Sequence, residues 1–533
     1  MIRLRQIKVS VIRNSKEEII KRVAQKLNIK ISSIEEIKII KKSLDARKKE
    51  ELFYVYELDV KVENEDYIIK KKASKDIFIS KDISYIFPKM GTKKLNYRPI
   101  IVGTGPAGLF CAYLLAENNY KPIIIERGEK VDDRIKTVEK FWQDNELNEE
   151  SNVSFGEGGA GTFSDGKLNT LIKDRERRGE KVFNIFVENG ANEEILYEQK
   201  PHIGTDKLRE IVKNMRNKII SMGGEFFYNT KLTDIKIVNN KIASIEVNNS
   251  KNIETDLLVL AIGHSARDTF QMLYEQGLKI ENKPFAIGVR VIHPQKMINE
   301  SQYGKKYAKI LSPASYKLTY QAKNKRGVYS FCMCPGGYVV NASSQRNGLV
   351  VNGMSNYMRE AKNANSAIVV TVSEKDYGTE PLSGIKYQKM LEEKAYRLGK
   401  GLIPVQLYKD FKENKTSQNI DKELLSIKGG YTLSNLNKIL PDFIIDSLKE
   451  AMPSFGNKIK GFDNDNTVLL GLESRTSSPI RILRDENYLS NIKGIYPCGE
   501  GAGYAGGITS SAIDGIKIAE AIAKVYKGGR IEC

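Results

Sequence analysis

Short apolar runs separated by helical patterns dominate the middle of the chain. Residues 100–102 and 123–125 are runs of isoleucine and valine, which are typical of strands buried on both faces of a parallel sheet. The apolar stretch over 109–117 between them predicts a buried helix. A third buried strand is expected within 254–263, and a helix over 508–526 follows a last short strand. This order predicts an α/β fold with a Rossmann-like, three-layer and mainly parallel sheet.

The first 90 residues follow a different pattern, in which polar and apolar positions alternate. The elements expected there are strands over 3–11, 36–43 and 52–62 and a helix over 16–27. Strand, helix, strand, strand indicates a small α+β domain, which we interpret as ferredoxin-like. The segment has 22 Lys and Arg against 14 Asp and Glu, so it is basic.

From about residue 282 the chain becomes rich in β patterns with a few helices. Because the buried-strand pattern returns near the C-terminus, we interpret this segment as an insertion into the nucleotide domain. The expected domains are a small basic α+β domain over 1–90, the first part of the nucleotide domain over 98–281, an inserted β-rich α+β substrate domain over 282–480, and the C-terminal part of the nucleotide domain over 481–533.

A glycine fingerprint follows the first buried strand. Gly103, Gly105 and Gly108 have the spacing that gives a tight turn, a close approach of a pyrophosphate to the backbone, and close packing of helix on strand. The helix N-terminus offers unpaired N–H groups to phosphates. Glu126 ends the second strand, 18 residues after Gly108, where an acid is placed to accept hydrogen bonds from ribose hydroxyls. The pattern predicts a bound dinucleotide.

A second glycine-rich loop spans residues 155–168, with five glycines in 14 residues. Glycine loses the most conformational entropy on ordering, so such a loop suits close contact between backbone and ligand. We interpret it as a second cradle along the cofactor, with a flexible lid as the alternative.

The return of the chain to the nucleotide domain favours a flavin over a nicotinamide. Glu500 follows the last strand, where it is placed to bind a ribitol hydroxyl. Gly507 and Ile508 begin the final helix, whose N–H groups and dipole would face the pyrimidine edge of the ring. We therefore expect non-covalent FAD. No second fingerprint follows, so NAD(P)H is expected only as a transient reductant.

The chain resembles two-domain flavoproteins of the glutathione-reductase type in its fingerprint, Glu126, residues 261–263 and residues 498–508. Glu500 departs from the aspartate common in that superfamily. More closely, the chain resembles a family of uncharacterised FAD-dependent dehydrogenases. The segments that carry this resemblance are residues 43–47, 155–168, 331–337, 351–355 and 473–479. It implies bound FAD, two domains plus the small N-terminal one, and no known substrate.

The expected FAD contacts combine these segments with Arg134, which lies on an amphipathic helix predicted over 131–142. Arg134 is interpreted as a phosphate ligand, with a solvated arginine as the alternative. The full set is Gly103, Gly105, Pro106, Ala107, Gly108, Glu126, Arg127, Arg134, Gly159, Ala160, Gly161, Thr162, Ser164, Gly166, Lys167, Leu232, Ala261, Gly263, Gly499, Glu500, Gly507 and Ile508.

Two residues are candidates for catalysis. His293 ends a predicted strand of the inserted domain and is the first candidate for handling a proton, ahead of His264 and His202. Arg475 lies among small hydroxyl residues just before the chain returns to the flavin, where it would clamp a substrate carboxylate or phosphate. The alternatives are a structural histidine and an interdomain ion pair.

Cys332 and Cys334 form a Cys-x-Cys pair within a predicted strand. Residues i and i+2 of a strand face the same side, so the pair is a candidate redox couple beside a flavin. Paired thiols in a strand are also common as small buried hydrophobic residues.

Composition limits the compartment and the partners. The five cysteines are not in paired metal spacing, so we expect no metal site, and their small number favours a reducing compartment, which we take to be the cytoplasm. The apolar runs are short, so we expect no membrane partner. The net charge of +19 suggests nucleic-acid binding as a hypothesis. However, the lysines are scattered along the chain and the sequence has no arginine-rich tract.

These observations predict a FAD-dependent oxidoreductase that transfers hydride between a small, anionic metabolite and flavin N5, with Arg475 orienting the substrate. One alternative is an RNA-associated flavoenzyme that docks RNA through the basic N-terminal domain. Another is a flavin scaffold or redox sensor without turnover. The substrate and the oligomeric state stay open.

Overall fold

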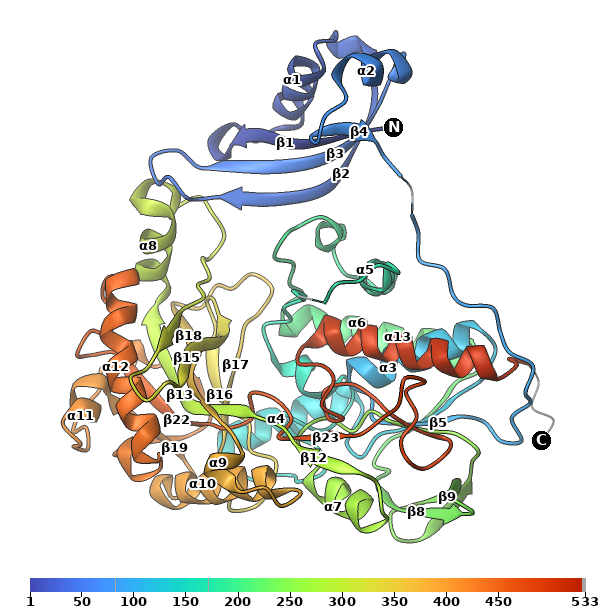
Figure 1. The fold of residues 1–533 in the computed structure, drawn as a ribbon. Coiled ribbons are helices and arrows are strands. Elements are labelled where there is room, and N and C mark those ends of the chain that lie inside the picture. Colours follow the sequence, from blue (N-terminus) through green and yellow to red (C-terminus); the bar gives the residue numbers. More distant parts are fainter. Residues whose placement is uncertain (82, 171, 530–533) are drawn as a thin grey trace.

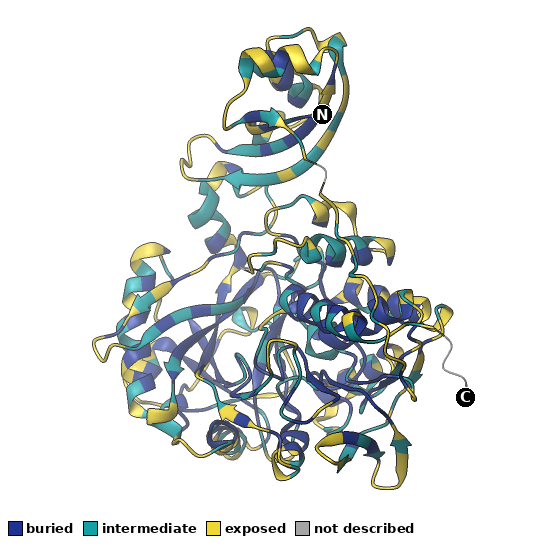
Figure 2. Cartoon of the chain, turned by 45° about the vertical axis from the view of Figure 1, so that its right-hand side comes forward, coloured by how far each residue is buried: buried dark blue, intermediate teal, exposed yellow. Residues whose placement is uncertain are grey.

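A computed structural model describes residues 1–81, 83–170 and 172–529 of the chain. The predicted C-terminal segment therefore extends four residues beyond the described part. A small N-terminal domain stands above a larger two-lobed body, and an extended linker runs from it along the side of the body (Figure 1). Buried residues fill the interior of the body, whereas exposed residues cover much of the N-terminal domain and the outer loops (Figure 2).

A five-stranded parallel sheet forms the centre of one lobe and confirms the Rossmann-like prediction. Its strands, in spatial order, are β24 (Ile495–Pro497), β11 (Leu258–Leu260), β5 (Ile100–Val102), β6 (Ile123–Ile125) and β7 (Glu225–Phe227). The bounds predicted for β5 and β6 are confirmed, while the strand expected within 254–263 is shorter because its first residues form the turn after a hairpin.

Alternate residues of these strands pack into two separate cores. One face of β5 presents Ile101 to helices α3 (Pro106–Glu117), α5 (Arg178–Glu188), α6 (Thr205–Ser221) and α13 (Ile508–Val525). The other face presents Ile100 and Val102 to a meander of β8 (Leu232–Val238), β9 (Lys241–Val247) and β10 (Lys251–Glu254), and to α7 (Arg267–Glu275). Successive residues of a strand face opposite sides of the sheet, so each side of the sheet packs against its own layer. The sheet and these two layers make up the three layers of the domain.

Helix α3 begins three residues before its predicted start. Gly105 caps it and Pro106 occupies its first turn, a position where the missing N–H of proline costs nothing. Ten of its 12 residues are buried, because α13 packs directly against it (Figure 1). Gly515 of α13 makes this approach possible, since a Cβ there would lie 2.2 Å from the Ala107 carbonyl oxygen.

The inserted lobe is built on a seven-stranded, mostly antiparallel sheet. Its strands, in spatial order, are β14 (Thr319–Gln321), β15 (Gly327–Cys334), β18 (Asn363–Val372), β13 (Phe285–Pro294), β22 (Val468–Glu473), β19 (Ile403–Leu407) and β21 (Tyr431–Leu433). Helices α8 (Gln295–Tyr307), α10 (Ser383–Gly399) and α12 (Asp442–Lys458) pack around it, and a small sheet of β17 (Val351–Met354), β16 (Tyr338–Asn341) and β20 (Ile427–Lys428) adjoins it.

The N-terminal domain has the complete ferredoxin-like order. Strands β2 (Ile34–Asp45), β3 (Phe53–Val62), β1 (Ile2–Ser10) and β4 (Ile77–Ile79) form an antiparallel sheet, with α1 (Lys16–Leu27) and α2 (Glu65–Lys72) joining them. The sequence did not predict α2 and β4, because α2 buries only Ile68 and β4 has three residues. Lys42 of β2 ties the domain to the body through Glu198, at 2.7 Å.

In the described part of the chain, no helix is long and apolar enough to cross a membrane. Nor does this part contain a cluster of His, Cys, Asp and Glu suited to a metal ion.

The contact between α13 and α3 can be tested with Gly515→Ala. The added methyl group would overlap the α3 backbone, and overpacking of this kind costs about 1–3 kcal/mol. We expect a fall of several degrees in the thermal midpoint measured by circular dichroism. Gly327→Ala is the control, because its Cβ would meet only the Thr371 side chain at 3.6 Å. Equal midpoints for the two variants would contradict this account of the packing.

Candidate functional site

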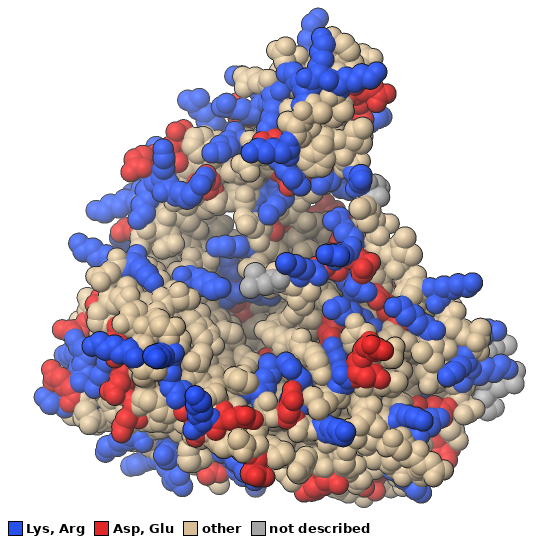
Figure 3. Space-filling model, viewed as in Figure 1, with Lys and Arg blue, Asp and Glu red and all other residues tan. Residues whose placement is uncertain are grey.

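A cavity of about 380 Å³ opens where the carboxyl ends of the parallel strands meet the inserted lobe. Segments from every part of the body line it, from the fingerprint at Gly103 to the N-terminus of α13 at Ile508. One face of the molecule is hollowed below the N-terminal domain, and Lys and Arg side chains lie around the hollow (Figure 3). This position, at the carboxyl edge of an open α/β sheet, is where such folds bind ligands.

The three fingerprint glycines occupy different environments. Gly103 has φ +102°, and a Cβ on it would lie 2.2 Å from the Ala261 carbonyl oxygen. Gly105 lines the cavity and faces Gly159 of the second loop, so two glycine segments approach each other there. Gly108 lies outside the cavity lining, because its task is helix packing: a Cβ on it would lie 1.9 Å from the Gly103 carbonyl oxygen.

Glu126 lines the cavity, but its carboxylate already accepts four hydrogen bonds from the protein. Its Oε2 accepts from the N–H and hydroxyl of Thr104, at 2.9 and 2.6 Å. Its Oε1 accepts from the N–H groups of Gly128 and Gly156, both at 3.0 Å. A carboxylate offers about four lone-pair sites. Glu126 therefore links the fingerprint to the second glycine loop, a role that the sequence did not predict.

Arg134 corrects the expectation of a phosphate ligand. It is fully buried behind the second loop and does not line the cavity. Its guanidinium donates to five backbone carbonyls within 2.7–3.2 Å, those of Asn152, Val153, Gly156, Glu157 and Gly159. The loop lacks strands and long helices, so this side chain satisfies carbonyls that regular structure would otherwise pair. These hydrogen bonds favour a fixed wall over the alternative of a flexible lid.

Glu157, within that loop, was missed as a functional residue. It is fully buried and accepts from the Val131 N–H at 2.7 Å, the Tyr228 hydroxyl at 2.6 Å and the Arg216 guanidinium at 2.6 Å. The sequence did contain a signal for this role, namely an acidic residue in a segment with five glycines. A carboxylate that is buried in such a segment needs several hydrogen-bond donors. It fixes the loop from the side opposite the cavity.

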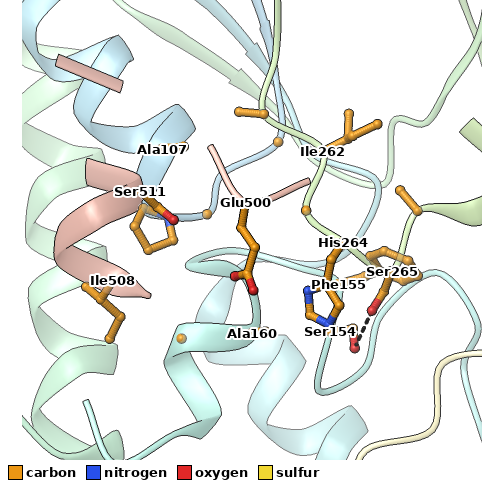
Figure 4. A pocket seen from close by; sticks show the side chains of 18 of the residues that line it. Ala107, Ser154, Phe155, Ala160, Ile262, His264, Ser265, Glu500, Ile508 and Ser511 are labelled. Carbon is orange, nitrogen blue, oxygen red and sulfur yellow. Dashed lines mark hydrogen bonds between the residues drawn. The ribbon is translucent and has the colours of Figure 1, made fainter. Parts of the chain in front are cut away.

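Glu500 reaches into the middle of the cavity, with His264 on one side and Ile508 and Ser511 on the other (Figure 4). Burial raises the pKa of its carboxyl to about 7, and the nearby Lys283 opposes that rise only in part. Gly499, predicted as a cofactor contact, does not line the cavity; its N–H donates to Asp514 at 2.8 Å and thereby positions Glu500.

Arg475 lies in the cavity wall, and it donates four hydrogen bonds within the protein from its five N–H groups. Its Nε and Nη2 bind Glu392 of α10 at 3.0 and 2.7 Å, and its Nη1 binds Ser265 and Ser344. Arg267 binds the other side of Glu392, and the two guanidinium groups keep the pKa of that buried carboxylate well below the usual range. Arg475 is thus an ion-pairing residue and not a substrate clamp, but its pair with Glu392 lies within the inserted domain, and it is Arg267 that forms the ion pair between the domains.

His293 is corrected as a catalytic candidate. It lies on β13 in the centre of the inserted sheet, 2% exposed and outside the cavity lining. Its Nε2 lies 2.8 Å from the Phe462 carbonyl oxygen and its ring packs on Phe462, while burial lowers its pKa to about 4. Of the three histidines, His264 lines the cavity, where burial and then Arg475 lower its pKa to about 3. His202 stacks on Tyr357.

The inserted lobe contributes a wall that the sequence did not assign to the site. Phe331, Cys332, Asn352 and Glu473 line the cavity from β15, β17 and β22. Polar residues inside strands otherwise made of buried apolar residues were the missed signal. Behind this wall, the fully buried Arg290 binds Glu473 at 2.8 Å and Asn352 at 2.8 Å.

The predicted residues therefore divide into two groups. Those outside the cavity lining are Gly108, Arg134, Thr162, Gly499 and His293. Those that line it are Gly103, Gly105, Pro106, Ala107, Glu126, Arg127, Gly159, Ala160, Gly161, Ser164, Gly166, Lys167, Leu232, Ala261, Gly263, Arg475, Glu500, Gly507 and Ile508.

Comparison with known proteins gives matches over three segments. Residues 284–476 match a family described as "FAD-dependent protein, C-terminal domain-like", residues 101–150 match an NAD(P)-binding Rossmann-like domain, and residues 1–61 match a domain of unknown function. An uncharacterized protein of Clostridium beijerinckii is 48% identical over 512 residues, which are 95% of this chain and 96% of that protein.

Solved structures resemble the chain at low identity. Glycine oxidase from Bacillus cereus has a TM-score of 0.35 and 12% identity, covering 80% of this chain and 94% of that one. The quinol fumarate reductase subunit FrdA of E. coli has a TM-score of 0.38 and 12% identity, covering 81% and 70%. These values are too low to bear on the substrate.

The role of Arg134 can be tested with Arg134→Met, which keeps much of the volume but removes the donors. Each buried carbonyl left unpaired costs about 1–3 kcal/mol. We expect a loss of cofactor affinity of about tenfold or more, since 1.4 kcal/mol is a factor of about ten. Lys136→Met is the control on the same helix, because Lys136 is exposed to solvent. FAD binding is measured by flavin fluorescence. Equal affinity in the two variants would contradict the role of Arg134 in fixing the loop.

Glu500 predicts a pH dependence of stability. Its folded-state pKa of about 7 exceeds the ordinary value of 4.5, so the folded protein holds this proton more tightly than the unfolded chain does. Its contribution to stability therefore falls as the pH rises between those values. In Glu500→Gln apoprotein, the thermal midpoint relative to wild type should be higher above pH 7 than below pH 4.5. Glu486→Gln, at an exposed carboxyl, is the matched control substitution. A difference for Glu500→Gln that does not change with pH would refute the assignment.

Proposed function

Because the chain belongs to a family of FAD-dependent oxidoreductases, we propose that it catalyses two-electron transfer between a small organic substrate and a non-covalently bound FAD. The finer placement among flavoproteins of the glutathione-reductase type remains part of this proposal. So does the expectation that NAD(P)H acts as a transient reductant.

The observation that carries the proposal is the meeting of three glycine segments around one cavity. The fingerprint, the second loop and residues 506–508 all line it. Gly105 and Gly159 face each other so closely that a Cβ on Gly159 would lie 2.9 Å from the Gly105 Cα. Backbone N–H groups exposed on such a surface suit the pyrophosphate and ring edge of a flavin dinucleotide.

These residues fit FAD along its length. Arg127 and residues 230–232 would bind the adenosine end, and the N-terminus of α3 the pyrophosphate. Glu500 and the N-terminus of α13 would bind the ribitol and the flavin ring. When bound, FAD supplies the capacity to accept or release two electrons. The wall formed by Phe331, Cys332, Asn352 and Glu473 would then face the substrate.

Three cavity residues are placed to act on a substrate. Glu500, with a pKa of about 7, would hold or release a proton near neutral pH. His264 is neutral and would act as a hydrogen-bonding group rather than as a cation. Since Arg475 is occupied by Glu392, an anionic substrate would rely on Lys167, which lines the cavity beside Asp165.

The function is tested by spectroscopy of the purified protein. We expect a flavin spectrum, or uptake of added FAD, and anaerobic bleaching by NADH, NADPH or at least one member of a panel of small hydroxy, amino and carboxylic acids. Gly159→Val should lose FAD, because Gly159 has φ +62° and faces Gly105. Gly327→Val, at the start of β15 and outside the cavity lining, should retain it.

Two results would reject the proposal. A wild-type protein that takes up no FAD would remove its basis. A protein that binds FAD but is bleached by no reductant or metabolite would favour the flavin scaffold instead. The match at residues 1–61 is to a domain of unknown function, so the RNA alternative, which rests on the basic charge of this domain, stays a prediction.

A further inference from the structure

Two thiols lie at the substrate side of the cavity. Cys332 lines the cavity and is half-buried, and Cys334 is buried two residues later on β15. The Cys334 Sγ lies 3.3 Å from the Cys332 carbonyl oxygen. Both cysteines are free, so the structure holds the pair in its reduced form.

The backbone at this point is irregular. Phe331 pairs with Ala367 and Cys334 with Asn365, so β15 carries one more residue than β18 between these pairs. Cys332 has φ +42°, in the left-handed region that a residue with a Cβ rarely adopts. Bulges of this kind re-aim side chains beside active sites. Here the bulge directs Cys332 toward the cavity and gathers the two cysteines in one turn of chain.

Two cations face the pair from outside the strand. The Lys167 Nζ donates to the Met333 carbonyl, between the cysteines, and the Arg290 Nη1 donates to the Cys332 carbonyl at 3.2 Å. A hydrogen bond from the Cys334 thiol, helped by Lys167 and Arg290, holds the pKa of Cys332 well below its usual range despite burial. The Cys334 pKa is raised correspondingly. The two shifts have opposite directions, so a proton leaves Cys332 more easily than Cys334.

The other two buried cysteines of the body differ. Cys111 is fully buried in α3, and Cys498 directly follows β24 at the floor of the cavity. Burial raises the pKa of both thiols, which keeps them protonated and unreactive. Arg484 lies near Cys498, but burial and Asp514 outweigh it, so a lowered pKa is particular to Cys332 among these three thiols.

We propose that Cys332 and Cys334 form a redox-active dithiol that exchanges two electrons with the bound FAD, an inference that rests on the proposed function. On oxidation, the Cys332 thiolate and the Cys334 thiol form a disulfide. The two electrons and the Cys334 proton pass to FAD, which becomes the reduced anion, so charge and hydrogen balance. The reverse reaction opens the disulfide. A disulfide between residues two apart closes a small ring, and strained disulfides are the easily reduced, catalytic kind.

The proposal assigns a class of substrate to the site. A reduced dithiol at the cavity wall exchanges with an external disulfide or thiol by attack of the thiolate on sulfur, through a mixed disulfide. Lys167 and the half-exposed position of Cys332 would admit a small disulfide compound. The chain would then couple a low-molecular-weight disulfide to FAD.

The test counts electrons in the holoenzyme. Protein oxidised with diamide, desalted and titrated anaerobically with dithionite should take up two electrons for FAD and two more for the disulfide. Cys332→Ser and Cys334→Ser should each lose the second pair, whereas Cys111→Ala should keep it. The protein is also alkylated before digestion and its peptides are weighed by mass spectrometry. Only in the oxidised wild type should the peptide that contains Cys332 and Cys334 be unalkylated and two hydrogens lighter than the dithiol peptide.

The outcomes separate this inference from the proposed function. Uptake of only the two FAD electrons by the oxidised wild type, with both cysteines alkylated, would overturn the dithiol while leaving the FAD oxidoreductase intact. Retention of the extra electrons in Cys332→Ser would overturn it as well. If either serine variant loses FAD, the peptide measurement on the wild type decides, because it needs no substitution.

Discussion

The cofactor cavity depends on one buried guanidinium. The glycine loop after α4 (Val131–Asp144) has almost no regular hydrogen bonding of its own, yet it forms the wall opposite the fingerprint. Arg134 donates to five backbone carbonyls in and just before this loop, and Glu126 accepts from the Gly156 N–H of the loop and the Thr104 N–H of the fingerprint. Glycine segments can approach a ligand closely only if something else fixes them, and here two charged side chains do so.

The sequence predicted the fold to the extent that local patterns carry it. The three-residue strands β5 and β6 were recognised because short runs of isoleucine and valine beside turn residues are typical of buried parallel strands. The ferredoxin-like order followed from alternating positions in β1, β2 and β3. Helix α2 was missed because a lysine-rich helix with one buried residue has no amphipathic signal.

The candidate site was predictable where backbone lines the cavity, because the spacing of the glycines in the sequence indicates where the backbone is exposed. It was less predictable where a side chain acts on another part of the protein. Arg134 and Arg475 were both expected to bind ligands, but arginine serves carbonyls and carboxylates of the protein with the same donors. His293 looked catalytic by its place at a strand end, and only the packing of Phe462 shows that it is enclosed. The sequence shows which hydrogen-bonding atoms a residue carries. The tertiary contacts determine whether a ligand or another part of the protein binds them.

The position of α13 has a consequence for biogenesis. This helix is the last long element of the chain, and it closes the cavity at Ile508 while packing along α3, some 400 residues earlier. Its far end also holds the interdomain linker, through the Gly91 N–H and the Ala523 carbonyl at 2.7 Å. During synthesis on the ribosome, the first half of the cradle emerges long before this helix exists. The cavity is therefore complete only after this helix has packed against the first half of the cradle.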